Sequence, residues 1–500
     1  MKKLILAFLF SATATLAQTA APVLKAGFAE RDITPGIGME QPGGYGKSFH
    51  LKFHDACKVR AAFFDDGKKR VALVGTDTLV IPRQVVLDAR ARIEKELGIP
   101  GDCVLVGASH SHSSGPVGMV LPGEYDAASD LVKRLAYEES SCADEGFLMK
   151  VTHEIVEGVR AAARGAVPAQ IGCGFGHEDK VAFNRRLRMK NGQSWSHPGQ
   201  GNPDMLEYAG PIDPQVGVIG AWDAEGRLLG TIVNYACHAT TNPGGISANW
   251  IYYLEKTIQG ALESRAPVVF LQGACGDVTQ VDNLSPHRRP GAEEWARFVG
   301  GRVGAEAVKV LLSMPRTGEA VLDSRQKVLS IPRRKPAPAR VQGSLEIIQA
   351  GRPQGDTSGY LFAKEILMLD HLCKVTPEVE CEVQVIQVGP AAFVTNPAEY
   401  FVQFGLDIKK GSPFACTFPV ELANGIVGYV PTEEAFGPNG GGYETRLTAY
   451  SNLVITAGRQ MADTGIALTK DMQPGPAPEH PKAPPFGRAW TYGNVPPELE

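Results

Sequence analysis

The sequence predicts an α/β fold of layered, mixed β-sheets with flanking helices. The first observation is a strand–helix–strand pattern between residues 71 and 107, where a helical apolar repeat separates two apolar runs. The second is a set of short apolar runs joined by turns that contain Asp and Gly, which is typical of β-hairpins. Parallel units and hairpins in one chain indicate mixed sheets that helices cover.

Two hairpins are expected from such paired runs. Residues 59–64 and 71–74 lie on either side of an Asp-Asp-Gly turn. Residues 216–222 and 228–236 flank an Asp-Ala-Glu-Gly turn in the same way. Each pair is predicted to form two antiparallel strands.

A helix over residues 84–97 is predicted by Val86 and Ile93 at helical spacing, with Gly98 as its end. The apolar run 103–107 is the next strand, so the unit is a βαβ crossover with parallel strands. The other elements expected are a helix that carries Leu148 to Val159, a helix over 250–262, and strands over 268–271, 383–388 and 392–395.

Composition limits the class of protein. The chain has 500 residues, 43% of them hydrophobic, which suffices for a large core. Its net charge of −4 comes from interspersed charges without a basic stripe, which argues against nucleic acid as a partner. No run after the N-terminus is long and uncharged enough for a transmembrane helix, and the sequence carries no signal for an oligomeric state.

Both ends of the chain differ from its middle. Residues 1–20 read as a signal peptide, with two lysines, an apolar run over 4–10 and small residues at 15 and 17. We therefore expect a periplasmic or secreted protein, and an uncleaved anchor or a buried helix is the alternative. Residues 474–500 are rich in proline and predict a tail wrapped on the surface.

The chain has nine cysteines. In an oxidising compartment Cys373 and Cys381 would close a short disulfide loop, and the odd count leaves at least one thiol free within a single chain. No Cys-x-x-Cys pair exists, which excludes a structural zinc ribbon.

Candidate metal ligands follow three of the apolar runs. His110 and His112 come just after run 103–107, His238 follows run 228–236, and Glu399 follows a strand and is expected in the first turn of a helix. Loops at the carboxyl ends of strands build sites in α/β proteins. Imidazoles and a carboxylate that meet there form the ligand set of a zinc hydrolase.

Each of these residues also has a structural explanation. The His110-x-His112 pair is explained equally well by bonds to neighbouring serines, and His238 by a bond to a backbone carbonyl inside the core. Glu399 would favour the helix dipole from a first turn.

The sequence also bears on two other reaction classes. No Gly-x-Ser-x-Gly elbow is present, which disfavours a serine α/β-hydrolase. A retaining glycosidase needs two close carboxylates, and Asp77, Asp277 and Glu399 are the candidates. Tyr429 and Tyr443 lie in glycine-rich segments, where phenols serve either a cleft or the surface.

A set of motifs in order along the chain carries a family resemblance. They are Arg31-Asp32-Ile33-Thr34-Pro35, Ser-His110-Ser-His112-Ser-Ser-Gly-Pro, Phe183-Asn184-Arg185, Cys-His238-Ala-Thr, Gly276-Asp277-Val278-Thr279, Asn396-Pro-Ala-Glu399 and Gly428-Tyr429…Tyr443-Glu444. With them the chain resembles the neutral/alkaline ceramidases from about residue 26 to about residue 460. The resemblance implies a catalytic domain over residues 21–473.

The resemblance also implies roles. Zinc would be held by four residues, namely His110, His238, Glu399 and Tyr429. A zinc-bound water would attack the amide carbonyl, with His112 as general base and then acid. Tyr443 would donate to the oxyanion, Arg185 would contact the substrate, and Thr279 would keep the hydroxyl that a serine supplies in the family.

The expected function is an exported zinc-dependent hydrolase that cleaves the N-acyl amide bond of ceramide or a related lipid-like amide. Two alternatives stay open: the same site acting on a polar amide, ester or sugar derivative, and a secreted binding protein without turnover. Asn249 stands where many relatives carry an acidic residue, and we expect the immunoglobulin-like C-terminal domain of full-length members to be absent.

Overall fold

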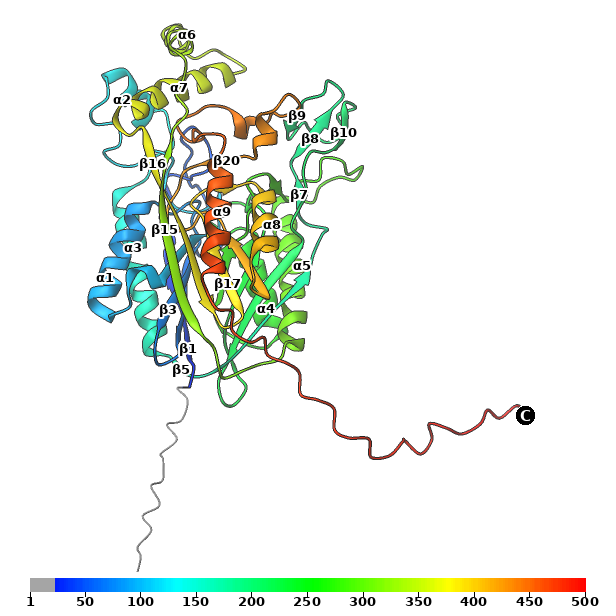
Figure 1. The fold of residues 1–500 in the computed structure, drawn as a ribbon. Coiled ribbons are helices and arrows are strands. Elements are labelled where there is room, and N and C mark those ends of the chain that lie inside the picture. Colours follow the sequence, from blue (N-terminus) through cyan, green and yellow to red (C-terminus); the bar gives the residue numbers. More distant parts are fainter. Residues whose placement is uncertain (1–22) are drawn as a thin grey trace, which may run out of the picture.

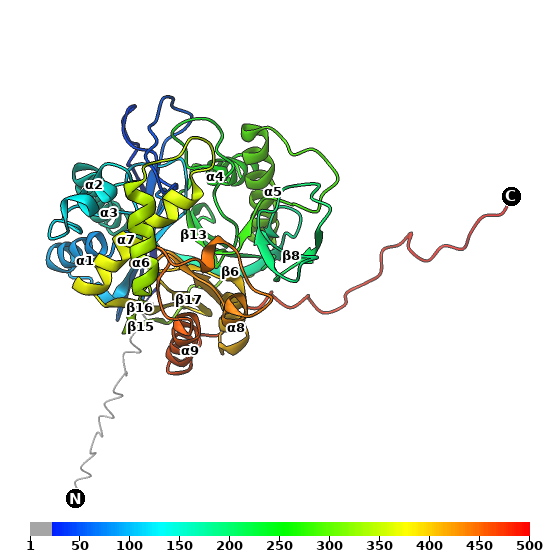
Figure 2. The ribbon, with the colours of Figure 1, turned by 90° about the horizontal axis from the view of Figure 1, so that it is seen from above.

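The computed structural model describes residues 23–500, so the predicted signal peptide lies outside the described residues. Three larger sheets form the centre of the fold (Figure 1). Viewed from above, α1 and α3, α4 and α5, and α8 and α9 surround the central strands as three groups (Figure 2). The predicted fold class of layered mixed sheets with flanking helices is confirmed.

The first sheet has the order β4-β3-β2-β1-β5. Its strands are β1 (Lys25–Asp32), β2 (Lys58–Asp65), β3 (Arg70–Thr76), β4 (Val104–Ala108) and β5 (Val167–Pro168). The predicted hairpin is the antiparallel pair β2–β3, and β3 and β4 are parallel around α1 (Arg83–Leu97). Gly98 ends α1 with a φ of 64°, as the sequence predicts. Helix α3 (Glu145–Arg164) packs on β1 and β2.

The second sheet has the order β13-β12-β11-β6. Its strands are β6 (Gln170–His177), β11 (Gln215–Trp222), β12 (Leu228–Tyr235) and β13 (Val268–Gln272). The second predicted hairpin is the antiparallel pair β11–β12, while β12 and β13 are parallel. Helix α4 (Trp250–Ala261) connects them, and α5 (Ala292–Ser313) packs on α4 and on the sheet.

The third sheet has the order β15-β16-β17-β19. Its strands are β15 (Leu322–Pro332), β16 (Glu378–Val388), β17 (Ala391–Thr395) and β19 (Cys416–Val420). Helices α8 (Val402–Gly411) and α9 (Ala457–Lys470) cover it. Between β15 and β16 the chain forms α6 (Pro338–Gln349) and α7 (Ser358–Val375), which meet α2 (Asp130–Tyr137) at one end of the molecule (Figure 1).

Short elements surround the ends of these sheets. They are β7 (Phe183–Asn184), β8 (Arg186–Met189), β9 (Ser194–Ser196), β10 (Met205–Tyr208), β14 (Val278–Thr279), β18 (Glu399–Tyr400), β20 (Tyr429–Val430), and single 3₁₀ turns over Gly101–Cys103, Glu433–Phe436 and Tyr443–Thr445.

Glycines inside the strands allow the sheets to pack closely. A Cβ on Gly75 of β3 would overlap the carbonyl oxygen of Phe270 in β13, and one on Gly217 of β11 would overlap the ring of Phe418 in β19. Each position needs the smallest residue because another sheet lies against its backbone. The three sheets therefore share one interior, and loops from all of them meet near the site described below.

Two expectations, a disulfide and a tail wrapped on the surface, differ from the structure. All nine cysteines are free, so Cys373 and Cys381 form no disulfide. Residues 481–500 lead away from the body with every side chain exposed, rather than wrapping on it (Figure 1). In the described part of the chain, no helix has the length and apolar character needed to cross a membrane.

Candidate active site

All eight residues singled out in the sequence line one cavity of about 450 Å³. They are His110, His112, Arg185, His238, Thr279, Glu399, Tyr429 and Tyr443. The other two carboxylates considered for a glycosidase are engaged elsewhere, because Asp77 pairs with Arg60 and Asp277 accepts from Asn184. The structure thus brings the predicted metal and catalytic residues together, and their roles stay predictions.

His110 lies two residues past the end of β4 and is buried. Its backbone has a φ of 61°, a left-handed conformation that non-glycine residues seldom adopt. Its Nδ1 lies 2.9 Å from the carbonyl oxygen of Leu79, which fixes the proton on Nδ1. The Nε2 atom lies 3.2 Å from Oε2 of Glu399 and 3.3 Å from Nε2 of His112.

His238 reaches the same point from the end of β12. Its Nδ1 lies 2.8 Å from the carbonyl oxygen of Cys275 and 3.0 Å from that of Val278. This is the backbone bond that the core-histidine explanation requires. The core-histidine explanation accounts for Nδ1 but not for Nε2, because Nε2 is directed into the cavity.

Glu399 lies in β18 and pairs in parallel with Tyr429 of β20. The prediction that it lies in the first turn of a helix opening at Asn396-Pro397 is wrong, because α8 begins only at Val402. Its Oε1 accepts a hydrogen bond of 2.7 Å from the hydroxyl of Tyr450. Its Oε2 is buried without a hydrogen-bond partner and lies 3.2 Å from Nε2 of both His110 and His238.

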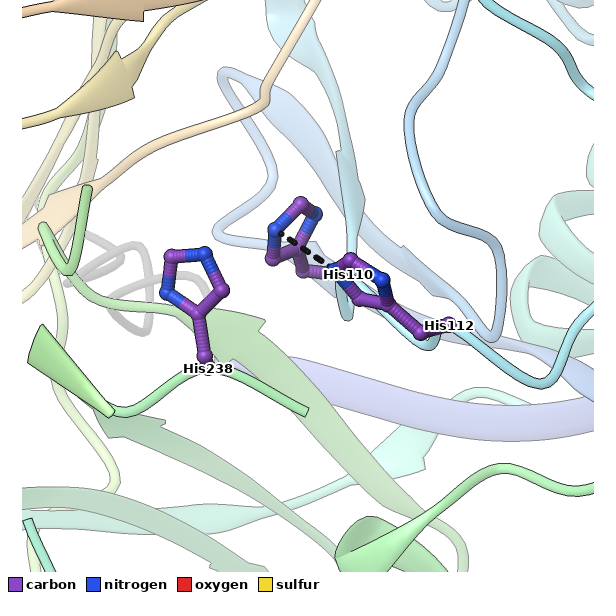
Figure 3. Close-up of side chains that lie close together, drawn as sticks. All are labelled: His110, His112 and His238. Atoms are coloured by element: carbon purple, nitrogen blue, oxygen red, sulfur yellow. Dashed lines mark hydrogen bonds between the residues drawn. The ribbon is translucent and has the colours of Figure 1, made fainter. Parts of the chain in front are cut away.

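Three polar atoms therefore converge. Nη1 of Arg185 donates to one of them, Nε2 of His238, over 3.1 Å, whereas Oε2 of Glu399 has no hydrogen-bond donor among the described residues. Buried acceptors left in this way are costly unless a cation lies among them. Two imidazole nitrogens and one carboxylate oxygen form a donor set that suits zinc. The imidazoles of His110, His112 and His238 offer nitrogens within 4.8 Å of one another (Figure 3). The residues present fit a metal ion.

The protonation states of Glu399 and His238 agree with this fit. Burial opposes ionisation of Glu399, but His110 and His238 outweigh it and hold the pKa of Glu399 well below its usual value. Burial and then the positive charge of Arg185 lower the pKa of His238 to about 3. An ionised carboxylate and a neutral imidazole are the states that bind metal. Burial opposes protonation of His110, but Glu399 outweighs it and raises the pKa of His110, so a metal ion would have to displace a proton there.

His112 stands beside the converging atoms. Its Nε2 lies 3.3 Å from Nε2 of His110, and Gly43 packs against its ring. Burial, followed by His110 and His238, lowers the pKa of His112 well below its usual value. The imidazole is therefore neutral and free to accept a proton.

Arg185 is held in one position by protein groups. Its Nε donates to Glu444 over 2.8 Å, and its Nη2 donates to the carbonyl oxygen of Gly276 over 2.7 Å. Its guanidinium lies 5.3 Å and 5.1 Å from the ring centroids of Tyr429 and Tyr443. The two phenol oxygens are 3.3 Å apart. This side of the cavity therefore carries a fixed positive charge and two hydroxyl groups.

Thr279 forms part of a polar wall. It belongs to β14, which pairs with β7, and its hydroxyl donates to Gln280 over 3.0 Å. Gln280 also bonds to Thr240, another lining residue.

Two further residues support the site and were missed in the sequence. Tyr450, bonded to Glu399, lies in a loop and carries no local signal. Glu421 follows directly after β19, so the rule that located the histidines at strand ends applies to it as well. Its carboxylate accepts from the backbone N–H groups of Cys275 (3.0 Å) and Tyr400 (2.7 Å), and burial raises the pKa of Glu421 to about 8.

Comparison with known proteins finds a similar sequence but no matching family model. No family model matches the chain. The neutral ceramidase of Pseudomonas aeruginosa is 27% identical over 469 residues, which cover 80% of this chain and 65% of that protein.

The chain also resembles solved structures. A ceramidase complexed with C2 and the neutral ceramidase from Pseudomonas aeruginosa each superpose with a TM-score of 0.63 at 20% identity. They cover 92% of this chain and 77% and 76% of those chains, respectively. The chain thus has a neutral-ceramidase-like fold and is similar in sequence to a neutral ceramidase over most of its length.

Proposed function

We propose that the chain is an exported, zinc-dependent hydrolase that cleaves the N-acyl amide bond of ceramide or a related lipid-like amide. The observation that carries the proposal is the convergence of Nε2 of His110, Nε2 of His238 and the unpartnered Oε2 of Glu399 in one cavity. The likeness to neutral ceramidases supports the amide as the bond cleaved.

His110, His238 and Glu399 would hold the metal, with Tyr429 as the fourth ligand. When bound, zinc acidifies a water molecule and polarises the scissile carbonyl. His112 takes the proton from the attacking water and returns it to the amine nitrogen as the carbon–nitrogen bond breaks. The products are a fatty acid and a free amine, so atoms and protons balance.

Tyr443 would stabilise the charge that develops on the carbonyl oxygen. Burial raises the pKa of Tyr443, so its phenol keeps its proton and donates it in a hydrogen bond. Arg185 lies on the same side and adds a positive charge that cannot be lost.

The cavity favours a substrate with hydrocarbon parts. Its lining also includes Tyr45, Leu79, Met119, Val281 and Trp295. Met119 belongs to the apolar loop Val117–Tyr125, in which Val117, Val120 and Tyr125 are buried and Leu121 is half-buried outside this cavity. Only this methionine of the loop is placed to meet an acyl chain.

A hydrolysis screen tests the proposal. The zinc-loaded protein is given fluorescent ceramide, short N-acyl amides and glycosides, and release of fatty acid or sugar is measured. We expect fatty acid from ceramide, lost in His112→Ala and retained in His153→Ala, since His153 is exposed on α3. Activity on glycosides alone would overturn the proposal, and binding without turnover would indicate the non-catalytic alternative.

The export proposal has its own test. Expression with the native N-terminus, fractionation of the cells and N-terminal sequencing should yield a periplasmic or secreted protein without residues 1–20. A full-length chain in the cytoplasmic fraction would contradict export.

A further inference from the structure

His197 lines the same cavity and belongs to none of the roles above. It follows β9 and has a φ of 49°, in the left-handed region. A non-glycine residue in this region carries strain that persists only where the surroundings impose it. Such strain is concentrated at sites that act on ligands.

The surroundings of His197 impose its conformation. Its backbone N–H donates to the carbonyl oxygen of Arg185 over 2.9 Å. The neighbouring Ser196 donates to Glu444, the carboxylate that also holds Arg185. Ser194 bonds to the carbonyl oxygen of Gly440 over 3.0 Å. His197 is therefore fixed to the two segments that carry Arg185 and Tyr443.

The imidazole of His197 is itself unengaged. His197 lines the cavity and is exposed, and within residues 23–500 no protein group hydrogen bonds to its ring nitrogens. Loss of surrounding water, with the positive charges of Arg185 and Arg289, lowers the pKa of His197 to about 4. Near pH 7 the ring is neutral and offers one donor and one acceptor.

This chemistry selects a type of ligand group. A hydroxyl is also one donor with acceptor capacity, so it matches a neutral imidazole on both counts. A carboxylate or phosphate would need a free cationic donor in the cavity, but the Arg185 nitrogens already bond to Glu444, Gly276 and His238, and Arg289 is not among the lining residues. The free imidazole therefore suits a hydroxyl better than an anion.

We propose that His197 is a specificity-determining residue that hydrogen bonds a hydroxyl group of the substrate on the Arg185 side of the cavity. The inference rests on the proposed function for the identity of the substrate. It adds that the enzyme prefers hydroxylated lipid amides to otherwise identical amides without the hydroxyl.

The test compares His197→Gly with the wild type. Glycine removes the imidazole and accepts the positive φ without strain, so this variant should fold at least as well, as thermal unfolding can verify. The probes are fluorescent ceramide and analogues that lack one hydroxyl of the sphingoid base. For the wild type we expect kcat/KM to fall about 10-fold for one analogue, the value of one hydrogen bond.

In His197→Gly the ratio of kcat/KM for ceramide to kcat/KM for this analogue should approach one. We expect the change through a higher KM for the hydroxylated substrate, with kcat nearly unchanged. His197→Asn tolerates the same backbone and should restore part of the preference. The preference should be constant between pH 6 and pH 8, because the ring stays neutral. A wild type without any hydroxyl preference, or a His197→Gly variant that keeps it in full, would overturn the inference.

Binding separates this inference from the proposed function. Affinities of the same lipids are measured in the His112→Ala background through the fluorescence of Trp295, which lines the cavity. If the hydroxyl preference in binding depends on His197 although the wild type shows no hydrolysis, the proposed function fails and the inference stands. If these lipids do not bind at all, the inference fails too.

Discussion

Oε2 of Glu399 and Nε2 of His238 lie 3.2 Å apart, and neither atom carries a proton for the other. The proton of His238 is on Nδ1, where two backbone carbonyls accept it. The carboxylate is ionised, since its pKa is well below the usual value. Arg185 donates to Nε2 of His238 over 3.1 Å, but Oε2 of Glu399 has no donor among the described residues, so a metal ion between the two atoms would stabilise both. The following predictions depend on this relationship and on its surroundings.

Glu399→Gln should separate metal binding from folding. The amide can donate a hydrogen bond to an Nε2 atom that the carboxylate leaves without a donor, which should stabilise the metal-free protein by about 1 kcal/mol. Metal affinity should fall at least about 100-fold, because a charged ligand is lost. Urea unfolding with a chelator and zinc titration measure the two effects. Glu382→Gln, a buried carboxylate paired with Arg90, should lose stability but keep zinc.

Tyr450→Phe should weaken metal binding without removing a ligand. Its hydroxyl orients Glu399 through Oε1, and loss of such outer contacts lowers metal affinity about 10- to 100-fold. Zinc affinity by competition with a chromophoric chelator checks this. Tyr235→Phe is the matched control, because that buried tyrosine bonds to the carbonyl of Glu178 away from the cavity. Equal affinities in both variants would contradict the role of Tyr450.

Gly43→Ala should impair catalysis through His112. An added Cβ would overlap the imidazole, so the ring must move away from the proton-transfer position. Misplacement of a reacting group costs about 100-fold in rate, so kcat should fall by that order while zinc content stays. Gly38→Ala is the control for backbone strain, since Gly38 also has a positive φ but no atom within 4 Å of the new Cβ. A kcat that falls equally in both variants would refute the steric explanation.

Arg60→Met should destabilise the fold. Arg60 is buried and bonds to Asp77 over 2.7 Å and to Glu255 over 2.6 Å. Its loss leaves buried carboxylates unpaired, which costs about 3–5 kcal/mol of unfolding free energy. Arg227→Met removes an exposed guanidinium from Asp223, whose carboxylate keeps hydrogen bonds from two backbone N–H groups, and should cost less than about 1 kcal/mol. Urea unfolding measures both free energies. A similar loss of unfolding free energy in the two variants would contradict the stabilising role of the buried Arg60 pairs.

Much of the fold could be predicted because its signals are local. The helix before Gly98 and the hairpin before His238 depend on apolar spacing and turn residues within about 30 positions of the chain. The strand-end rule then placed His110 and His238 near each other without knowledge of the sheets. It would also have located Glu421, which follows β19.

Other features depend on contacts that the sequence does not reveal. Asn396-Pro397 predicts a helix, but Glu399 lies in a strand because it pairs with Tyr429, 30 residues away. Tyr450 supports the site only through the fold around it. The strain at His197 comes from its bond to Arg185, which belongs to a different strand region. Such relationships become visible only when the sheets are assembled.

Metal content is the most direct test of the central claim. The purified chain is loaded with zinc, passed through gel filtration and analysed for its elements. The arrangement of His110, His238 and Glu399 predicts about one zinc ion per chain, and almost none in Glu399→Gln. A wild-type chain without zinc, or a Glu399→Gln variant that retains one zinc per chain, would contradict the claim.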